Sequence, residues 1–181
     1  VFEAGQPAPG SMPGKGFTRA QVDLAPGETR TLTLAEPWAS AKLWWPDDPQ
    51  LYVLLTRLYA DDEDNTPIDM RRTRFGFREF GLDAEGKHFE LNGVPWRGRA
   101  DAWHFMGIPQ LTPAYARAWY EMARAANVNL IRLHAQVYPE YYLDVADEMG
   151  MLIVDESALW GSAINFWYDE DFLRRAKAQV E

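Results

Sequence analysis

Residues 127–157 read NVNLIRLHAQVYPEYYLDVADEMGMLIVDES and carry the clearest structural pattern in the chain. Two apolar runs, LIRL (130–133) and MLIV (151–154), each end in polar residues, and a helical pattern over 139–149 separates them. Strands that are apolar throughout are typical of parallel sheets, because helices cover both faces of such sheets. This stretch therefore predicts a strand–helix–strand unit whose polar residues gather at the carboxyl ends of its strands.

The pattern continues on both sides of this unit. A strand is expected over VPWRGRA (94–100), followed by a helix that Thr112 caps and that has Pro113 at its first position. Six apolar residues recur at helical spacing and are expected to form the buried face of this helix: Tyr115, Ala118, Trp119, Met122, Ala123 and Ala126. A further helix is expected to begin at residue 169.

Residues 87–181 therefore form three predicted β-α units, for which two arrangements fit. One is an open, doubly wound sheet, and the other is the first three units of a (β/α)8 TIM barrel. A whole barrel takes about 250 residues, so a barrel would be truncated here. The strand pattern alone leaves both arrangements open.

Residues 17–86 follow a different pattern, in which short strands are joined by tight turns. One hairpin is expected from strands at 20–24 and 29–34, and another from strands at 51–60 and 68–77. Antiparallel strands with no helix between them indicate part of a β-sandwich.

Two local signals complete the predicted domain organisation. Residues 1–16 are rich in Gly and Pro and are expected to be irregular. The Asn-Gly pair in HFELNGVPW (88–96) is a strong hairpin signal. The predicted domains are an irregular segment at 1–16, a partial immunoglobulin-like sandwich at 17–86 and an α/β part at 87–181.

The composition narrows the functional classes. Of the 181 residues, 47% are hydrophobic, which is enough for one or two domains with a core. The net charge of -9 argues against binding to nucleic acids or anionic membranes, because their phosphates would be repelled. The chain has no cysteine and no apolar run of about 18 residues, so neither a disulfide nor a membrane-spanning helix is expected. The cellular compartment stays open.

Polar or aromatic residues follow each of the three predicted parallel strands. They are Arg99, Asp101, Trp103 and His104 after the first strand, Arg132 and His134 after the second, and Asp155, Glu156 and Ser157 after the third. Ligands bind at the carboxyl ends of parallel strands in both candidate arrangements. These side chains are therefore expected to converge on one face.

Each of these candidates also has a purely structural interpretation. Arg132 and His134 could be an inward-facing pair that satisfies neighbouring carboxylates. Asp155 and Glu156 could cap the next segment, with one of the two carboxylates salt-bridged to Arg132. Asp101 and His104 could be loop residues at the rim. Trp103 is either a platform on which a sugar ring stacks or a core residue. The sequence alone does not decide between these roles.

Five stretches share their order and spacing with one known family. They are LWWPDDPQLY (43–52), RFGFREF (74–80), FELNGVPWRGRA (89–100), NVNLIRLHAQVYP (127–139) and DVADEMGMLIVDES (144–157). Together they resemble glycoside hydrolase family 2, which includes β-galactosidases, β-glucuronidases and β-mannosidases. The resemblance covers roughly residues 17–181. It implies an immunoglobulin-like sandwich that leads into the first strands of a (β/α)8 catalytic barrel.

The resemblance implies a retaining glycosidase that hydrolyses β-linked sugars. Such enzymes use two carboxylates about 5 to 5.5 Å apart, one as acid/base and one as nucleophile. In the family these glutamates follow barrel strands four and seven, so both are expected downstream of residue 181. The chain is then a fragment that is expected to be inactive by itself. Glu156 matches the family's strand-three Asp-Glu position, which shapes the pocket and is not catalytic.

The resemblance carries over to few individual residues. Arg132 and His134 match the Arg and His of the family's R-T-S-H-Y-P stretch, which line the sugar subsite, although RLHAQVYP places the His one residue closer to the Arg. After Asp-Glu, the run SALWGS (157–162) lacks the Glu and His that bind a metal in many β-galactosidases of the family, so no metal or other cofactor is expected. The residues expected to bind substrate are Arg132, His134, Asp101, His104, Glu156 and Trp103.

Other interpretations stay open beside this one. A non-catalytic carbohydrate-binding module would use Trp44, Trp45 or Trp103 as stacking platforms. A vestigial glycosidase-like protein would keep only the scaffold. An open α/β enzyme is disfavoured because the chain lacks a Gly-rich phosphate loop and a G-x-S-x-G nucleophile elbow. The expected partner is a carbohydrate. A truncated barrel with unpaired sheet edges is expected to aggregate or to form oligomers.

Overall fold

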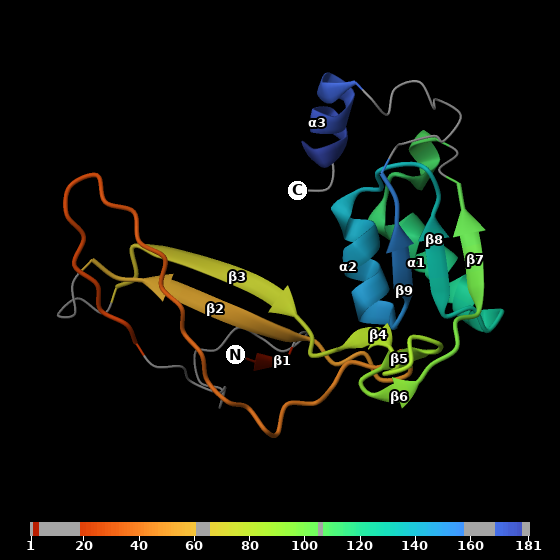
Figure 1. The fold of residues 1–181 in the computed structure, drawn as a ribbon, viewed down its shortest axis with the longest axis horizontal. Helices are drawn as coiled ribbons and strands as arrows, with labels where there is room; N and C mark the ends of the chain where they lie inside the picture. The colour runs from red at the N-terminus through yellow and green to blue at the C-terminus, as the bar shows by residue number, and fades with distance from the viewer. Residues whose placement is uncertain (1, 4–18, 61–65, 105–106, 158–168, 179–181) are drawn as a thin grey trace. The chain divides into compact units, whose positions relative to one another are not determined.

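The chain forms two compact units. The computed structural model describes residues 2–3, 19–60, 66–104, 107–157 and 169–178 (Figure 1). The first unit is Val1–Leu43 with Gln50–Phe77, and the second is Trp44–Pro49 with Arg78–Glu181. The short segment 44–49 therefore belongs to the second unit, although the chain on both sides of it belongs to the first.

The first unit contains a three-stranded antiparallel sheet in the order β1-β2-β3. Its strands are β1 (Phe2–Glu3), β2 (Tyr52–Leu58) and β3 (Asp69–Phe75). The register of β2 and β3 runs from the Tyr52–Phe75 pair to the Leu58–Asp69 pair. The predicted hairpin over 51–60 and 68–77 is confirmed.

An aromatic cluster forms the core of the first unit. The Tyr52 ring centroid lies 4.7 Å from that of Trp38, 5.9 Å from that of Phe75 and 5.8 Å from that of Phe77. The Tyr52 side chain is buried, and its hydroxyl accepts a hydrogen bond from the backbone N–H of Lys42 at 2.9 Å. Tyr52, at the start of β2, thus contacts both the neighbouring strand β3 and the segment that precedes β2.

The predicted hairpin over 20–24 and 29–34 is wrong. The described residues 19–51 contain no strand, although the turn forms and the N–H of Glu28 donates to the carbonyl of Ala25 at 2.9 Å. The apolar residues of the alternating pattern, Leu24, Leu32 and Leu34, are exposed. Period-two alternation stabilises a strand only where a second layer covers its apolar face, and these side chains have no such cover.

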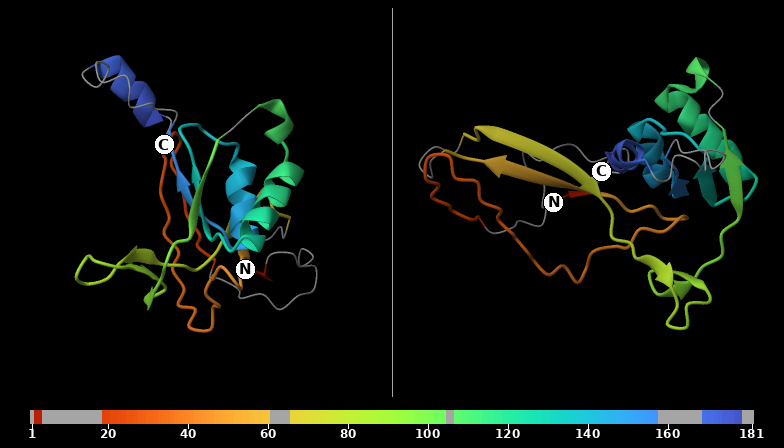
Figure 2. Two further views of the ribbon diagram at one scale, coloured as in Figure 1. Left: turned by 90° about the vertical axis from the view of Figure 1, so that its right-hand side faces the viewer. Right: turned by 45° about the horizontal axis from the view of Figure 1, so that its top comes forward.

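The second unit contains a three-stranded parallel sheet in the order β7-β8-β9. Its strands are β7 (Ala100–Trp103), β8 (Leu130–Leu133) and β9 (Leu152–Asp155). The connecting helices α1 (Pro113–Ala125) and α2 (Glu140–Met149) lie on one face of this sheet, as the views in Figures 1 and 2 agree. The predicted order of parallel strands and helices is confirmed.

Side chains from α1, α2 and this sheet form the core of the second unit. The buried members of the core are Trp103, Ala116, Tyr120, Ala123, Ile131, Leu133, Tyr138, Tyr142, Val145, Ala146, Met149 and Met151. Ile131 and Leu133 of β8 have no exposed surface, whereas Arg132 between them is exposed. The alternation of β8 therefore directs Arg132 to the sheet face that the helices do not cover.

A short 3-10 helix, η1 (Ile108–Gln110), leads into α1, and Glu170–Ala178 forms α3. The predicted end of α2 is confirmed, because Gly150 adopts a left-handed conformation with φ 73°. Pro139 precedes α2 as its N-cap rather than occupying its first turn. The helical pattern over 139–149 therefore predicted both ends of α2 to within one residue.

Thr112 caps α1 as predicted. Its hydroxyl oxygen accepts a hydrogen bond from the backbone N–H of Tyr115 at 3.1 Å. Replacing Thr112 with Ala is expected to lower the free energy of unfolding by about 1 kcal/mol, because that N–H loses its partner. Chemical denaturation measures this loss, and Thr112→Ser is the control that should retain most of the stability. Equal losses in both variants would contradict the capping role.

The predicted buried face of α1 is correct only in part, because Ala123 is buried and Trp119 packs against the core, whereas other predicted members are exposed. The residues buried on α1 are Ala116, Tyr120 and Ala123, whereas Tyr115 and Met122 are exposed. The helix has two apolar stripes, and two alanines beside Tyr120 allow the helix backbone to approach the sheet. The stripe that contains Tyr115 and Met122 is left on the flank of the helix.

The predicted strand over 94–100 is two separate strands. Val94–Pro95 forms β6, which pairs with β5 (Phe89–Leu91) across the Asn-Gly turn, and β5 also pairs with β4 (Phe80–Leu82). The first parallel strand is β7, which begins only at Ala100. The hairpin prediction at 88–96 is confirmed, and that hairpin takes up the residues assigned to the start of the parallel strand.

Segment 44–49 is anchored within the second unit by Trp44, which is fully buried. The Trp44 Nε1–H donates to the carbonyl of Asp147 at 2.8 Å, and the Trp44 carbonyl accepts from Asn92 Nδ2 at 3.0 Å. The Arg78 guanidinium lies 4.6 Å from the Trp44 ring centroid and pairs with the Asp147 carboxylate at 2.8 Å. These contacts join segment 44–49 to the end of α2 and to the sheet that β4, β5 and β6 form.

Candidate functional site

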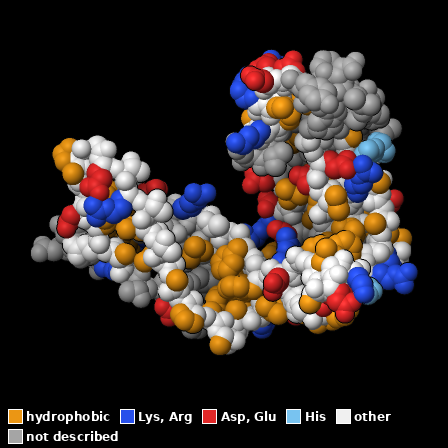
Figure 3. Space-filling view, in the orientation of Figure 1, with side chains coloured by type: hydrophobic (Ala, Val, Ile, Leu, Met, Phe, Trp, Pro, Cys, Tyr) orange, Lys and Arg blue, Asp and Glu red, His pale blue; other side chains and the backbone are white. Residues whose placement is uncertain are grey.

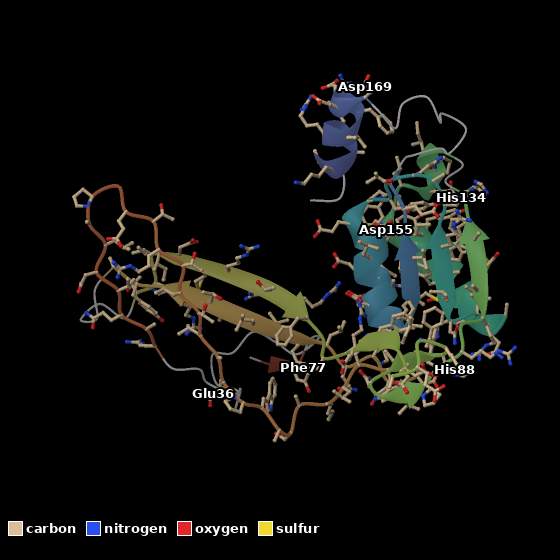
Figure 4. The ribbon with its side chains drawn as sticks, in the orientation of Figure 1. Glu36, Phe77, His88, His134, Asp155 and Asp169 are labelled. Atoms are coloured by element: carbon tan, nitrogen blue, oxygen red, sulfur yellow. The ribbon has the colours of Figure 1, made fainter. Side chains whose placement is uncertain are left out.

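Three residues meet at the carboxyl end of the parallel sheet. Arg132 on β8 donates from Nε to Oε1 of Glu156 at 2.6 Å. His134 Nδ1 lies 3.1 Å from the other carboxylate oxygen of Glu156. His134 and Asp155, labelled in Figure 4, lie at the end of the sheet where the strands finish, and charged and histidine side chains gather there in Figure 3. Two of the predicted strand ends are thus brought together.

The loop after β8 completes this group of contacts. The backbone N–H of Ala135 donates to Oε2 of Glu156 at 2.7 Å. Ala135 has φ 53°, a left-handed conformation that is unfavourable for a residue with a Cβ. The N–H of His134 and the hydroxyl of Tyr138 both donate to the Trp103 carbonyl, at 2.9 Å and 3.1 Å. The loop is therefore held from both neighbouring strands.

His104 and Asp101, both predicted site residues, have different positions. The exposed His104 packs edge-on against His134, with 4.5 Å between the ring centroids, so it belongs to the same group. Asp101 accepts hydrogen bonds from the N–H of Ala102 at 2.8 Å and from Trp103 Nε1 at 3.3 Å. In the register of β7 and β8, Ala102 is the residue opposite Arg132, so Asp101 points to the other face of the sheet.

Trp103 lies in the core, with only 3% of its surface exposed. Its ring stacks on Trp119 at a centroid distance of 3.8 Å and on Tyr120 at 5.0 Å. A buried ring offers no free face to a sugar. The structure therefore favours the core role for Trp103 among the two that the sequence left open.

Arg99 was predicted to end the first strand, and this prediction is wrong. Arg99 precedes β7, so it lies at the amino end of the sheet. Its N–H donates to Oδ1 of Asn129 at 2.7 Å, and its Nε donates to the carbonyl of Asn127 at 2.5 Å. These two asparagines close the turn from α1 to β8, and Arg99 joins them in that structural role.

The contacts of Glu156 determine its charge. The hydrogen bond from Arg132, followed by those from the Ala135 N–H and His134, lowers the pKa of Glu156 from 4.5 to about 2. The Glu156 side chain is 25% exposed to solvent, so water partly screens these interactions. Glu156 is thus an ionised acceptor at neutral pH.

The depressed pKa predicts how stability depends on pH. The folded carboxylate stabilises the chain fully above the unfolded pKa of 4.5, and this contribution is lost as pH falls towards the folded value of about 2. We expect the stability difference between the wild type and Glu156→Gln to shrink progressively from pH 5 to pH 2. Denaturant unfolding at several pH values measures this difference. A difference that stays constant over that range would contradict the assignment.

The arrangement is suited to binding hydroxyl groups. The side chain of Arg132 is 47% exposed and that of His134 is 26% exposed, so both reach solvent at the end of the sheet. A guanidinium donates hydrogen bonds, and an imidazole nitrogen donates or accepts them. Within the described residues, no group of three or more His, Asp or Glu side chains is arranged to hold a metal ion.

Sequence reasoning missed two members of the site, Ala135 and Tyr138. An alanine at positive φ has no sequence signature, because the conformation is set by the contacts of the loop. Tyr138 lies between the predicted strand over 130–133 and the predicted helix over 139–149, and the sequence analysis assigned it no role. Its hydroxyl bond to the Trp103 carbonyl depends on a strand 35 residues earlier.

Comparison with known proteins places the chain in a family. Residues 12–78 match the family described as Glycosyl hydrolases family 2. The chain is 33% identical to a β-galactosidase of Bacteroides ovatus over 134 residues, which cover 71% of the chain and 15% of that protein. It is 30% identical to a putative β-glucuronidase of Formosa agariphila over 64% of the chain and 11% of that protein.

A solved structure of a family 2 member from Bacteroides cellulosilyticus is similar in both sequence and fold. It superposes with a TM-score of 0.64 and 26% identity, over 78% of the chain and 18% of that protein. The chain belongs to glycoside hydrolase family 2. The resemblance of its five motifs to the family is thereby confirmed. This family 2 chain spans 11% and 15% of the length of the two curated relatives named above.

Proposed function

We propose that this family 2 chain carries the first three β-α units of a (β/α)8 barrel and, with them, part of the sugar subsite of a retaining β-glycosidase. The observation that carries the proposal is the Arg132–Glu156–His134 group at the carboxyl ends of β8 and β9. Active sites of (β/α)8 barrels lie at this end of the strands. In this role Arg132 and His134 bind hydroxyl groups of the sugar.

The flank of α1 supports the barrel assignment. Tyr115 and Met122 of α1 are exposed, as are Ile108 and Leu111 just before it. The α2 helix packs against α1 through the Arg117–Glu148 ion pair, which lies on the other flank. One edge of β7 pairs with no described strand. This edge and the apolar flank of α1 both suit contact with a neighbouring β-α unit, which barrel closure requires.

The state of Glu156 argues against its use as a catalytic acid. A general acid in a glycosidase needs a raised pKa, whereas the contacts of Glu156 lower its pKa to about 2. Its carboxylate oxygens are also occupied by donors from the protein. The catalytic pair of the proposed glycosidase is therefore assigned to residues downstream of 181.

The proposal is tested with the full-length product of the gene that encodes this chain. We expect it to hydrolyse at least one 4-nitrophenyl β-glycoside among the galactoside, glucuronide, mannoside and glucosaminide. NMR of the first-formed sugar should show retained anomeric configuration. The 181-residue chain alone should give no turnover. Inversion, or no hydrolysis of any β-glycoside by the full-length protein, would overturn the proposal.

The alternative of a non-catalytic carbohydrate-binding module loses two of its three stacking platforms. Trp44 is fully buried and Trp103 is nearly so, which leaves Trp45 as the partly exposed candidate of the three. Titration of the chain with oligosaccharides, followed by tryptophan fluorescence, separates the two functions. Tight binding by the chain alone would favour the module, because part of a barrel presents an incomplete site.

Within the described residues, no helix has the length and apolar character needed to cross a membrane.

A further inference from the structure

We infer that Glu156 is a positioning residue, which fixes Arg132, His134 and the backbone of Ala135 in their places and does not itself bind the sugar. The catalytic consequence of this inference rests on the proposed glycosidase function, but its structural content does not.

The donors around the Glu156 carboxylate come from one short stretch of chain. Oε1 accepts from Arg132 Nε at 2.6 Å, and Oε2 accepts from the Ala135 N–H at 2.7 Å and faces His134 Nδ1 at 3.1 Å. All three partners lie within residues 132–135, at the end of β8 and the start of its loop. A single side chain, that of the residue after β9, therefore fixes two side chains and one backbone group.

The contact with His134 fixes which ring atom reaches outward. Because Nδ1 faces the carboxylate, Nδ1 carries the proton and Nε2 is directed away from Glu156. His104 packs edge-on against the same ring with 4.5 Å between the centroids, so the ring plane is held from a second side. The Glu156 carboxylate thus sets the orientation of the His134 ring and of the Arg132 guanidinium.

The backbone of Ala135 shows that Glu156 holds the loop under strain. Ala135 has φ 53°, which only glycine adopts without penalty. Its N–H donates to the Glu156 carboxylate, and the preceding N–H, that of His134, donates to the Trp103 carbonyl at 2.9 Å. The charge-assisted bond offsets the unfavourable conformation. Removing the carboxylate should release the loop. A glycine at position 135 adopts the same φ without penalty, so the loop should then keep its conformation without the hydrogen bond to Glu156.

The test measures hydrogen–deuterium exchange at single amides in the wild type, Glu156→Ala, Ala135→Gly and the double variant. We expect the Ala135 amide to exchange about tenfold or more faster in Glu156→Ala, because it loses a charge-assisted hydrogen bond. In the double variant, the amides of residues 134–137 other than 135 should return towards wild-type exchange. Ala135→Gly alone should leave those amides within about twofold of the wild type.

The Asp83 site is a matched control, because there too a carboxylate accepts from a backbone N–H and a histidine ring. Asp83 Oδ1 accepts from the Lys87 N–H at 2.8 Å, and its Oδ2 lies 2.8 Å from His88 Nδ1. His88 lies in the turn between β4 and β5, at the other end of the second unit from His134 (Figure 4). Asp83→Ala should speed exchange at Lys87 and leave Ala135 unchanged. Unchanged exchange at Lys87 in Glu156→Ala shows that the faster exchange in this variant does not extend to the Asp83 site.

The catalytic readout separates this inference from the proposed function. In the full-length protein, Glu156→Ala should raise KM more than it lowers kcat, and Ala135→Gly should restore part of the loss. Wild-type exchange at Ala135 in Glu156→Ala would overturn the inference and leave the glycosidase proposal standing. The expected exchange pattern in a full-length protein without glycosidase activity would overturn only the function.

Discussion

Replacing Gly150 with alanine is expected to lower the free energy of unfolding by about 3 kcal/mol or more. Gly150 ends α2 at φ 73°, where a residue with a Cβ loses about 1 to 2 kcal/mol. A Cβ at this position would also overlap the carbonyl oxygen of Pro46 and lie 2.6 Å from its carbonyl carbon. Forcing backbone apart costs about 1 to 3 kcal/mol more. Denaturant unfolding of the variant measures the sum.

The control for Gly150→Ala is Gly93→Ala. Gly93 has a nearly identical φ of 74°, but a Cβ there would have nothing within 4 Å. This control isolates the cost of the left-handed conformation, about 1 to 2 kcal/mol. The excess in Gly150→Ala then reports the contact of segment 44–49 with the end of α2. Equal losses in the two variants would show that this contact is not made in solution.

Replacing Trp44 with alanine is expected to cost about 3 to 5 kcal/mol, the range for removing a buried aromatic side chain. Trp44 has no exposed surface, donates a hydrogen bond to the Asp147 carbonyl and packs under Arg78. The loss of stability includes this packing and the hydrogen bond from Trp44 Nε1 to the Asp147 carbonyl. Denaturant unfolding followed by circular dichroism measures it.

Two further variants separate the contributions of Trp44. Trp44→Phe keeps an aromatic ring but loses the Nε1–H donor, so it should cost less than the alanine variant. Arg78→Ala removes an exposed cation from the ring face and should cost about 1 kcal/mol or less. A Trp44→Ala variant within about 1 kcal/mol of the wild type would show that segment 44–49 is not anchored as described.

The parallel strands and their helices could be predicted because burial and periodicity agree there. LIRL and MLIV are short apolar runs, and their flanking helices have Thr112 and Gly150 as clear boundary residues. The hairpin over 20–34 failed for the opposite reason. Its alternation is as regular as that of a real strand, but no second layer covers its leucines. Local pattern cannot show whether a covering layer exists.

The buried face of α1 was predicted only in part because the helix has two apolar stripes. Either stripe satisfies the spacing rule, and the choice depends on how closely the helix approaches the sheet. Ala116 and Ala123 allow a close approach beside Tyr120, and no count of hydrophobic residues reveals that preference.

The candidate site was predicted in its side chains but not in its backbone. Arg132, His134 and Glu156 were identified from their positions after two apolar strands, but the sequence left open whether Asp155 or Glu156 pairs with Arg132. The Ala135 N–H was not identified, because its role depends on a positive φ that alanine rarely adopts. Which of these residues contact a sugar stays a prediction.

The most direct test of the sugar-binding role is the kcat/KM of Arg132→Ala in the full-length protein. Arg117→Ala is the matched control, because Arg117 is also 47% exposed and ion-paired, but it lies on the flank of α1 with Glu148 as its partner. We predict that Arg132→Ala lowers kcat/KM about 10- to 100-fold on the preferred aryl β-glycoside, and that Arg117→Ala stays within about twofold of the wild type. Equal kcat/KM values for Arg132→Ala and the wild type would contradict the assignment of this strand end to the sugar subsite.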